Sequence, residues 1–341
     1  MKLKDELEKL CTLDGVSGNE DEIRGYLCAR MRGKAVWKID ALGNVIAFKK
    51  GKKPPENKVM VCAHIDEVGL IITHINADGT LKFSTVGGID PAVLFGRRVR
   101  VGDGKLTGVI GAKAIHNLTA AEKKERPAAE KLSIDIGCTS AEEAQALCSP
   151  GDFAYFCADF TAFGEGRIAA KALDDRAGVA VMLALIDEDL EYDTWFVFTV
   201  QEEIGTRGAK TATFEVEPAF CVVLEATTAA DIPGVSEEKR VCALGGGPVV
   251  SYMDRATIYN RELYNLAFDT ARAEGIPCQT KSLVAGGNDA GAIHVSKTGV
   301  RTIAVSVPCR YLHSPHCVIA YEDLKQMKKL VRALLERIGG L

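Results

Sequence analysis

The chain has 341 residues, which at roughly 150 residues per domain predicts about two domains with cores large enough to fold without disulfides. Its 42 lysines and arginines nearly balance 46 aspartates and glutamates, and the net charge of −4 argues against a basic nucleic-acid-binding surface. No apolar run reaches the roughly 18 residues of a membrane span, and the N-terminus lacks the apolar core of a signal peptide. We therefore expect a cytoplasmic protein with no nucleic-acid or membrane partner.

The start of the chain reads as helices followed by strands. Two amphipathic helices are predicted over residues 3–13 and 21–31. A short strand is predicted over 44–49, and a buried apolar strand over 58–63 ends at His64, Ile65 and Asp66. This order is typical of an α/β domain.

The pattern of predicted secondary structure changes after about residue 67. Short β-like segments are separated by Gly, Asp and Pro, and only the stretch near 141–147 has a clear helical pattern. The expected strands cover residues 70–75, 81–84, 97–101 and 107–110. A small β-rich domain is therefore predicted over residues 67–165.

After residue 166 the sequence returns to strands that alternate with helices. Helices are predicted over residues 174–186, 261–274 and 322–338, and strands over 194–200, 220–224 and 302–307. Such alternation favours a mainly parallel sheet flanked by helices. The predicted architecture is one α/β domain, residues 1–66 and 166–341, interrupted by the β-rich insertion.

Residues that suit metal binding follow the apolar strands of this α/β domain. In an open α/β sheet, ligands bind beyond the carboxyl ends of the strands. The residues at these positions are His64, Asp66, Glu202, Glu203, Glu225 and, after a short loop, His313, and Asp174 begins the long helix. One such residue alone is most often structural, but their convergence indicates a shared site.

Imidazoles and carboxylates in these numbers suit a hydrolase with two divalent ions. A carboxylate can bridge two ions with its two oxygens, and Asp174 is the candidate for that role. Asp66 can accept the second ring N–H of His64, because alternate residues of a strand point the same way. Glu202 and Glu203 should point apart, so that one binds metal and the other serves as general base.

Five motifs, in this order along the chain, resemble the M42 family of metallo-aminopeptidases, which includes the TET peptidases, bacterial glutamyl aminopeptidases and members named endoglucanase M. The resemblance extends from about residue 5 to 338. The motifs are His64-Ile65-Asp66-Glu67-Val68-Gly69, Ala172-Leu173-Asp174-Asp175-Arg176, Gln201-Glu202-Glu203-Ile204-Gly205, Asp289-Ala290-Gly291-Ala292-Ile293 and Arg310-Tyr311-Leu312-His313-Ser314-Pro315.

The resemblance implies a zinc-peptidase-like fold and a set of metal ligands. Asp174 would bridge two divalent ions per chain, expected to be Zn²⁺ or Co²⁺, with His64 and His313 on different ions. Glu203 would be a further ligand. Where the family usually has Asp, this chain has Glu225, which keeps the carboxylate but adds a methylene and so puts geometry, metal preference and rate in question.

The resemblance also implies catalytic roles. Glu202 would be the general base that takes a proton from a metal-activated water and passes it to the leaving amine, and Asp66 would support the site. The bond between Asp174 and Asp175 is expected to be cis. The expected activity is hydrolysis of N-terminal residues from peptides. The insertion would mediate dimerisation, and dimers of this family can assemble into dodecamers.

Three rival interpretations remain. An endoglucanase-type glycoside hydrolase would use two carboxylates, but these stand roughly 5 to 9.5 Å apart in glycosidases, whereas Glu202 and Glu203 are neighbours. A non-catalytic metal-binding assembly protein would keep the ligands without turnover. A related hydrolase of acylated amino acids would need no free amino terminus. Within the aminopeptidase interpretation, Arg255 could attract acidic substrate side chains.

Overall fold

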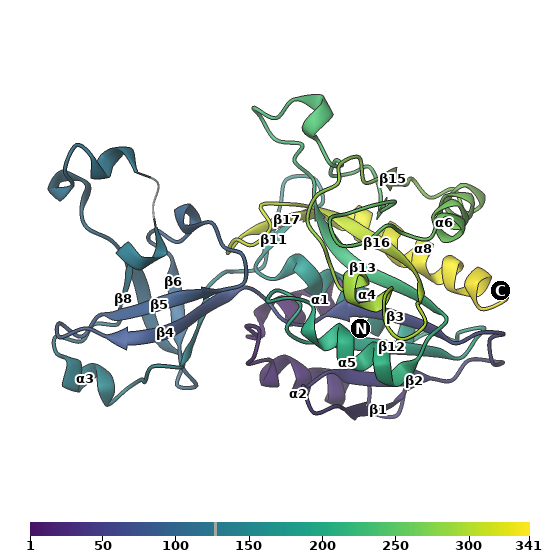
Figure 1. The fold of residues 1–341 in the computed structure, drawn as a ribbon, viewed down its shortest axis with the longest axis horizontal. Coiled ribbons are helices and arrows are strands. Elements are labelled where there is room, and N and C mark those ends of the chain that lie inside the picture. The colour runs from purple at the N-terminus through teal and green to yellow at the C-terminus, as the bar shows by residue number, and fades with distance from the viewer. Residues whose placement is uncertain (126–127) are drawn as a thin grey trace.

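The computed structural model describes residues 1–125 and 128–341, and consists of a large α/β body with a smaller barrel projecting from one side (Figure 1). Each part has its own hydrophobic core. Val61, Phe196 and Val222 belong to the core of the large body, whereas Leu70 and Ile134 belong to that of the barrel. The buried apolar side chains thus form two separate cores, one in the α/β body and one in the barrel.

The large body is built on an eleven-stranded sheet. Its main path runs through β1 (Val36–Ile39), β2 (Val45–Lys49), β12 (Thr194–Thr199), β3 (Val59–His64), β13 (Phe220–Thr228), β16 (Arg301–Arg310), β17 (Cys317–Ala320), β11 (Arg167–Ala170) and β10 (Thr161–Phe163). The short strands β14 (Val249–Val250) and β15 (Gln279–Thr280) extend the sheet from β16.

The prediction of a mainly parallel sheet needs correction, because the sheet is mixed. The four central strands β12, β3, β13 and β16 are parallel to one another. The outer strands β1, β2, β17, β11 and β10 all pair antiparallel. Parallel strands need a long crossover connection, usually a helix, whereas antiparallel strands can be joined by short turns. The alternation of strands and helices in the sequence therefore does not reveal the antiparallel outer strands.

Helices cover the sheet. Helix α4 (Leu173–Ile186) packs on the central strands β3 and β13, and its burial on nearly every side explains its apolar sequence. The other helices are α1 (Leu3–Thr12), α2 (Asp21–Arg30), α3 (Ala141–Gln145), α5 (Arg207–Val216), α6 (Arg261–Ala273), α7 (Ala290–Ile293) and α8 (Tyr321–Ile338). Among the described residues, none of these helices combines the length and apolarity needed to cross a membrane.

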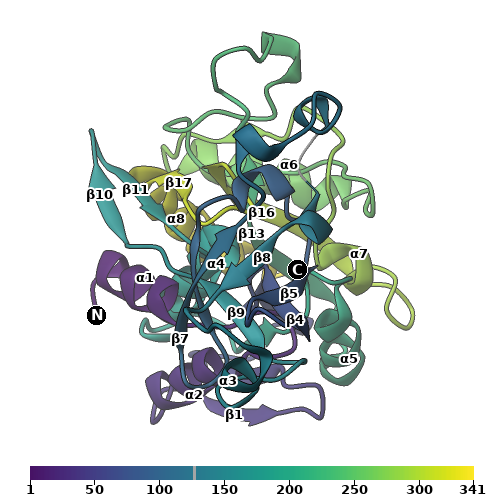
Figure 2. The ribbon, with the colours of Figure 1, turned by 90° about the vertical axis from the view of Figure 1, so that its left-hand side faces the viewer.

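The insertion forms a closed six-stranded barrel, which lies on the side of the molecule that faces the viewer in Figure 2. Its strands follow the order β4 (Gly69–Ile75), β5 (Leu81–Val86), β8 (Ser133–Asp135), β7 (Leu106–Gly111), β6 (Arg98–Val101) and β9 (Phe153–Phe156). Strand β10 lies inside the range expected for the insertion, yet it pairs with β11 and continues the large sheet. The barrel strands thus end before the expected limit.

Asp14 links the barrel to the α/β body. This buried carboxylate, in the loop after α1, forms ion pairs with Arg100 and Lys105 of the barrel and with Lys171 of the body. Burial alone would raise the pKa of Asp14, but these cations outweigh it and hold the pKa at about 2. The network anchors the barrel beside the start of α4, where the candidate site lies.

Candidate metal centre

The candidate site lies at the carboxyl ends of the central parallel strands. His64 is the last residue of β3 and pairs with Thr199, the last residue of β12. Glu202 and Glu203 follow β12 within a few residues. Glu225 was expected to follow its strand, but it lies inside β13, which continues along β16 as far as Thr228. The parallel register brings all these side chains to one edge.

Two further residues complete the group from outside these strands. Asp174 lies at the start of α4, in a non-helical first turn, and its peptide bond to Asp175 is cis, as the resemblance implies. His313 lies in the turn between β16 and β17 with a left-handed φ of 56°. A non-glycine residue in this conformation is uncommon and is often found at functional sites.

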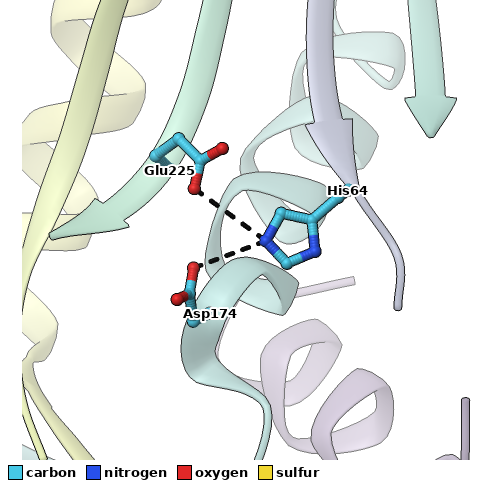
Figure 3. Close-up of side chains that lie close together, drawn as sticks. All are labelled: His64, Asp174 and Glu225. Carbon is cyan, nitrogen blue, oxygen red and sulfur yellow. Dashed lines mark ion pairs between the residues drawn. The ribbon is translucent and has the colours of Figure 1, made fainter. Parts of the chain in front are cut away.

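The first cluster contains His64, Asp174 and Glu225 (Figure 3). The Nε2 atom of His64 is 3.5 Å from Oδ1 of Asp174 and 3.9 Å from Oε2 of Glu225. All three side chains point toward one another from β3, α4 and β13 (Figure 3).

The second cluster shares Asp174 with the first. The Nε2 atom of His313 is 3.6 Å from Oδ2 of Asp174 and 3.3 Å from Oε2 of Glu203. The two oxygens of Asp174 therefore face different histidines. This is the arrangement expected of a carboxylate that bridges two ions.

The chemistry of both clusters fits divalent cations. Two ligand atoms about 2.1 Å from a tetrahedral zinc ion are roughly 3.4 Å apart, close to the spacings seen here. Oδ1 of Asp174 and Oε1 of Glu225 are buried without a hydrogen-bond partner among the described residues. Such oxygens are costly unless a cation or a proton satisfies them. His64, Asp174, Glu225, Glu203 and His313 could together hold two ions.

The shifted pKa values of the clustered side chains also fit a site for cations. Burial raises the pKa of Glu203 to about 7 and the pKa of Glu225 well above its ordinary value. Burial would also raise the pKa of Asp174, but His313 and His64 together hold it well below its usual range. Asp174 in turn raises the pKa of His313 to about 10. In the part of the chain that the structure describes, the ion-pair partners of Asp174, Glu203 and Glu225 are histidines, not lysines or arginines.

Asp66 positions the adjacent glutamates. Its Oδ1 atom accepts a hydrogen bond from the backbone N–H of Glu202 at 3.0 Å, and its Oδ2 atom accepts from Glu203 at 3.1 Å and from the hydroxyl of Ser17 at 2.6 Å. The expected contact to the ring of His64 is different in kind. The Nδ1 atom of His64 is 3.1 Å from the main-chain carbonyl oxygen of Asp66, whereas the carboxylate is 3.6 Å away.

Replacing Asp66 with asparagine is expected to lower kcat about 10- to 100-fold, with activity measured at saturating metal concentration. The asparagine oxygen can accept one of the two backbone N–H groups, but its amide would face the other donor and displace Glu202 or Glu203. Steady-state kinetics with metal analysis would test this. Ser17→Ala, which removes only the third contact, is the matched control. A kcat equal to that of the wild type would show that Asp66 does not position the pair.

The barrel contributes one group to the site. The carbonyl oxygen of Gly88, in the segment after β5, lies 2.8 Å from Nδ1 of His313 and can accept its N–H. In the neutral ring that binds a metal ion, this contact would keep the proton on Nδ1 and leave Nε2 free and directed at the second cluster. The preceding Gly87 has a φ of 84°, and a Cβ there would lie 2.7 Å from Val68 and 3.4 Å from Glu203. Residue types alone do not reveal such a main-chain contribution.

Three buried acids near the site were not predicted as functional residues. Asp175 and Asp289 are fully buried, and each has one oxygen without a hydrogen-bond partner among the described residues. The other oxygen of Asp289 accepts from the Thr199 hydroxyl at 2.5 Å, and burial raises the pKa of Asp289 to about 6. Glu20 accepts from the backbone N–H of Gln201, and burial raises its pKa to about 7. Asp175 and Asp289 stand in the quoted motifs, which could have identified them.

Known proteins with similar sequences and structures indicate the family of this chain. A family model described as M42 glutamyl aminopeptidase matches residues 43–330. The lysyl aminopeptidase of Pyrococcus furiosus is 35% identical over 341 residues, which cover 97% of this chain and 96% of that protein. The glutamyl aminopeptidase of Lactococcus lactis is 30% identical over 351 residues, covering 99% and 97%. The TET1 peptidase of Pyrococcus horikoshii, described as assembling into a tetrahedron or a large octahedral shell, superposes with a TM-score of 0.86 at 36% identity, covering 98% of this chain and 99% of that one.

Proposed function

The chain belongs to the M42 family of aminopeptidases, and from that premise we propose that it removes N-terminal residues from peptides at a centre of two divalent ions. His64, Asp174 and Glu225 would hold one ion, and Asp174, Glu203 and His313 the other. The observation that carries this proposal is that the two oxygens of Asp174 face different histidines. Imidazole and carboxylate ligands suit Zn²⁺ or Co²⁺.

Different residues of the chain would have different roles in hydrolysis. Bound divalent ions would supply Lewis-acid chemistry, which polarises a carbonyl and acidifies water. The carboxylate of Glu202, which makes no hydrogen bond among the described residues, would accept the proton of the attacking water and deliver it to the leaving amine. Asp66 would hold Glu202 and Glu203 through their backbone N–H groups.

Chelation followed by metal addition is expected to abolish and then restore release of residues from free N-termini, with no release from N-acetylated peptides. The reason is that the clustered carboxylates require cations, and an uncapped ammonium group suits this acidic site. Hydrolysis of leucyl and glutamyl p-nitroanilides and of matched free and acetylated peptides, before and after Zn²⁺ or Co²⁺ addition, measures this. Equal cleavage of acetylated peptides would favour an acyl-amino-acid hydrolase, and release of reducing sugar from glucans without metal dependence would favour a glycosidase.

The insertion over residues 67–165 would serve as a dimerisation domain. A cavity of about 810 Å³ on the barrel is lined by charged residues such as Lys113 and Glu122 and by apolar residues that include Phe95 and Ile115, which are 47% and 73% exposed. Exposed apolar surface of this kind supports a protein partner. By analogy with the assembling TET1 peptidase, one structure of which is described as a dodecamer, that partner would be a second copy of the chain, and dimers could form a dodecamer.

A further inference from the structure

Side chains hold the backbone segment that follows β12, residues 200–203. Its four backbone N–H groups donate in turn to Oδ1 of Asn44, to Oε1 of Glu20 and to the two oxygens of Asp66. These acceptors come from the segments before β2, before α2 and after β3, and all three residues are buried. Three separate parts of the chain therefore fix the segment that carries the two adjacent glutamates of the candidate site.

Gln201 is the residue of this segment that most needs support from outside. Its φ of 54° lies in the left-handed region, which a non-glycine residue keeps only where its surroundings hold it. Its backbone N–H donates to Glu20 at 3.3 Å, and its carbonyl oxygen accepts from the backbone N–H of Arg207 at 3.1 Å. Because the backbone angles of Gln201 set the direction of the next residue, a shift at Gln201 would move Glu202.

Glu20 reaches Gln201 from the loop between α1 and α2. Its Oε1 atom also accepts the backbone N–H of Gly18 at 2.8 Å, within its own loop. The neighbouring Asn19 ties this loop to the barrel, since its side-chain amide donates to the hydroxyl of Tyr155 at 2.9 Å. The loop is thus anchored independently of the candidate site, so that Glu20 can act as a fixed support for Gln201.

The stability of the fold does not by itself account for a glutamate at this position. Glu20 precedes the first turn of α2, but its side chain makes no capping hydrogen bond with that helix. It is 3% exposed, and among the described residues no ion pair joins it to a cation. Burial, and to a smaller extent the charge of Asp66, raise the pKa of Glu20 to about 7. A buried carboxylate without a cationic partner is costly to the fold.

We propose that Glu20 is a positioning residue for hydrolysis, which accepts the backbone N–H of Gln201 and thereby aims the carboxylate of Glu202 at the attacking water. This inference rests on the proposed function. Glu20 acts on the residue before Glu202, whereas Asp66 holds the N–H groups of Glu202 and Glu203 themselves. The two acids therefore have separate effects that mutagenesis can distinguish.

The test separates the hydrogen bonds of Glu20 from its charge. Glu20→Gln keeps the length of the side chain and a carbonyl oxygen that can accept both bonds, whereas Glu20→Ala removes the acceptor. At saturating metal concentration, we expect Glu20→Ala to lower kcat for a leucyl p-nitroanilide about 10- to 100-fold with KM changed less than about 3-fold. Glu20→Gln should keep kcat within about 3-fold of the wild type. Asp21→Ala, at the next residue, whose exposed carboxylate pairs with Arg24, should leave both constants unchanged.

A double mutant distinguishes the positioning of Glu202 from a general loss of structure. If Glu20 acts through Glu202, its effect disappears once residue 202 cannot serve as a base. Adding Glu20→Ala to Glu202→Gln should therefore lower the residual kcat less than about 2-fold. A further loss of about 10-fold in this background would overturn the proposal. So would a kcat of Glu20→Gln as low as that of Glu20→Ala, or a kcat of Glu20→Ala within about 3-fold of the wild type.

If Glu20→Ala does not fold, Glu20→Asp takes its place. Aspartate keeps the charge but is one methylene shorter, so it should reproduce the loss of kcat, and an unchanged kcat would contradict the proposal. Failure of the proposed function is distinguishable, because the wild type itself would then release no residue from substrates with a free amino group.

Discussion

Replacing Glu202 with glutamine is expected to lower kcat by about 10² to 10⁴-fold while both metal ions stay bound. Glutamine keeps the size of the side chain and the backbone N–H that donates to Asp66, but it cannot accept the proton of the attacking water. The carboxylate of Glu202 is suited to this role, because burial raises its pKa well above the ordinary value and so makes it a stronger base. Kinetics on a leucyl substrate with metal analysis of the same samples would measure both quantities.

The matched control is the same substitution at the neighbouring residue. Glu203 is 3.3 Å from His313 and belongs to the second cluster, so Glu203→Gln should lose metal as well as activity. Loss of activity with retained metal at residue 202, and loss of both at 203, would separate the base from the ligand. More than about a tenth of wild-type kcat in Glu202→Gln would be incompatible with a general-base role.

The sequence predicts the central part of the fold better than its edges. Strands β3, β12, β13 and β16 are apolar runs separated by helical segments, which is the pattern that a parallel crossover imposes. Strand β1 has four residues that are all exposed, so no hydrophobic alternation reveals it. The predicted end of β13 at residue 224 is also wrong. The charge of Glu225 suggests that the strand stops before it, but Glu225 pairs with Ser306 of β16 and the strand continues.

Part of the candidate site could also be predicted from the sequence, and part could not. His64 and Glu203 could be grouped from the sequence because they follow strands of one sheet, whose carboxyl ends share an edge. Asp174 and His313 lie outside these strands and could be added because of their metal-binding side chains and the motifs that contain them. The contacts of Gly88 and of the Asp66 carbonyl could not, since a main-chain carbonyl has no signature in the residue type. Tertiary structure alone reveals that Glu20 holds Gln201, because the two residues are 181 positions apart in the sequence.

Metal ions are expected to stabilise this protein much more at pH 8 than at pH 5. In the metal-free fold, burial raises the pKa of Glu203 from 4.5 to about 7, and Asp174 raises the pKa of His313 to about 10. Above about pH 4.5 the folded chain therefore holds protons that the unfolded chain releases, so the stability contributed by Glu203 is complete below that pH and is lost as the pH rises through 7. The contribution of His313 is lost in the same direction, between about pH 6.5 and 10.

Divalent ions take the place of these protons, because the ligands must be deprotonated to bind them. Rising pH thus weakens the metal-free fold and strengthens metal binding, and both effects enlarge the stabilisation by metal. Thermal unfolding with chelator and with excess Zn²⁺ should give a metal-induced increase in Tm at least about 5 °C larger at pH 8 than at pH 5. Asp174→Asn, which removes the shared carboxylate, should lose most of the increase at pH 8. Equal increases at both pH values would mean that Glu203 and His313 carry no extra protons in the metal-free fold, and that the two clusters are not the metal centre.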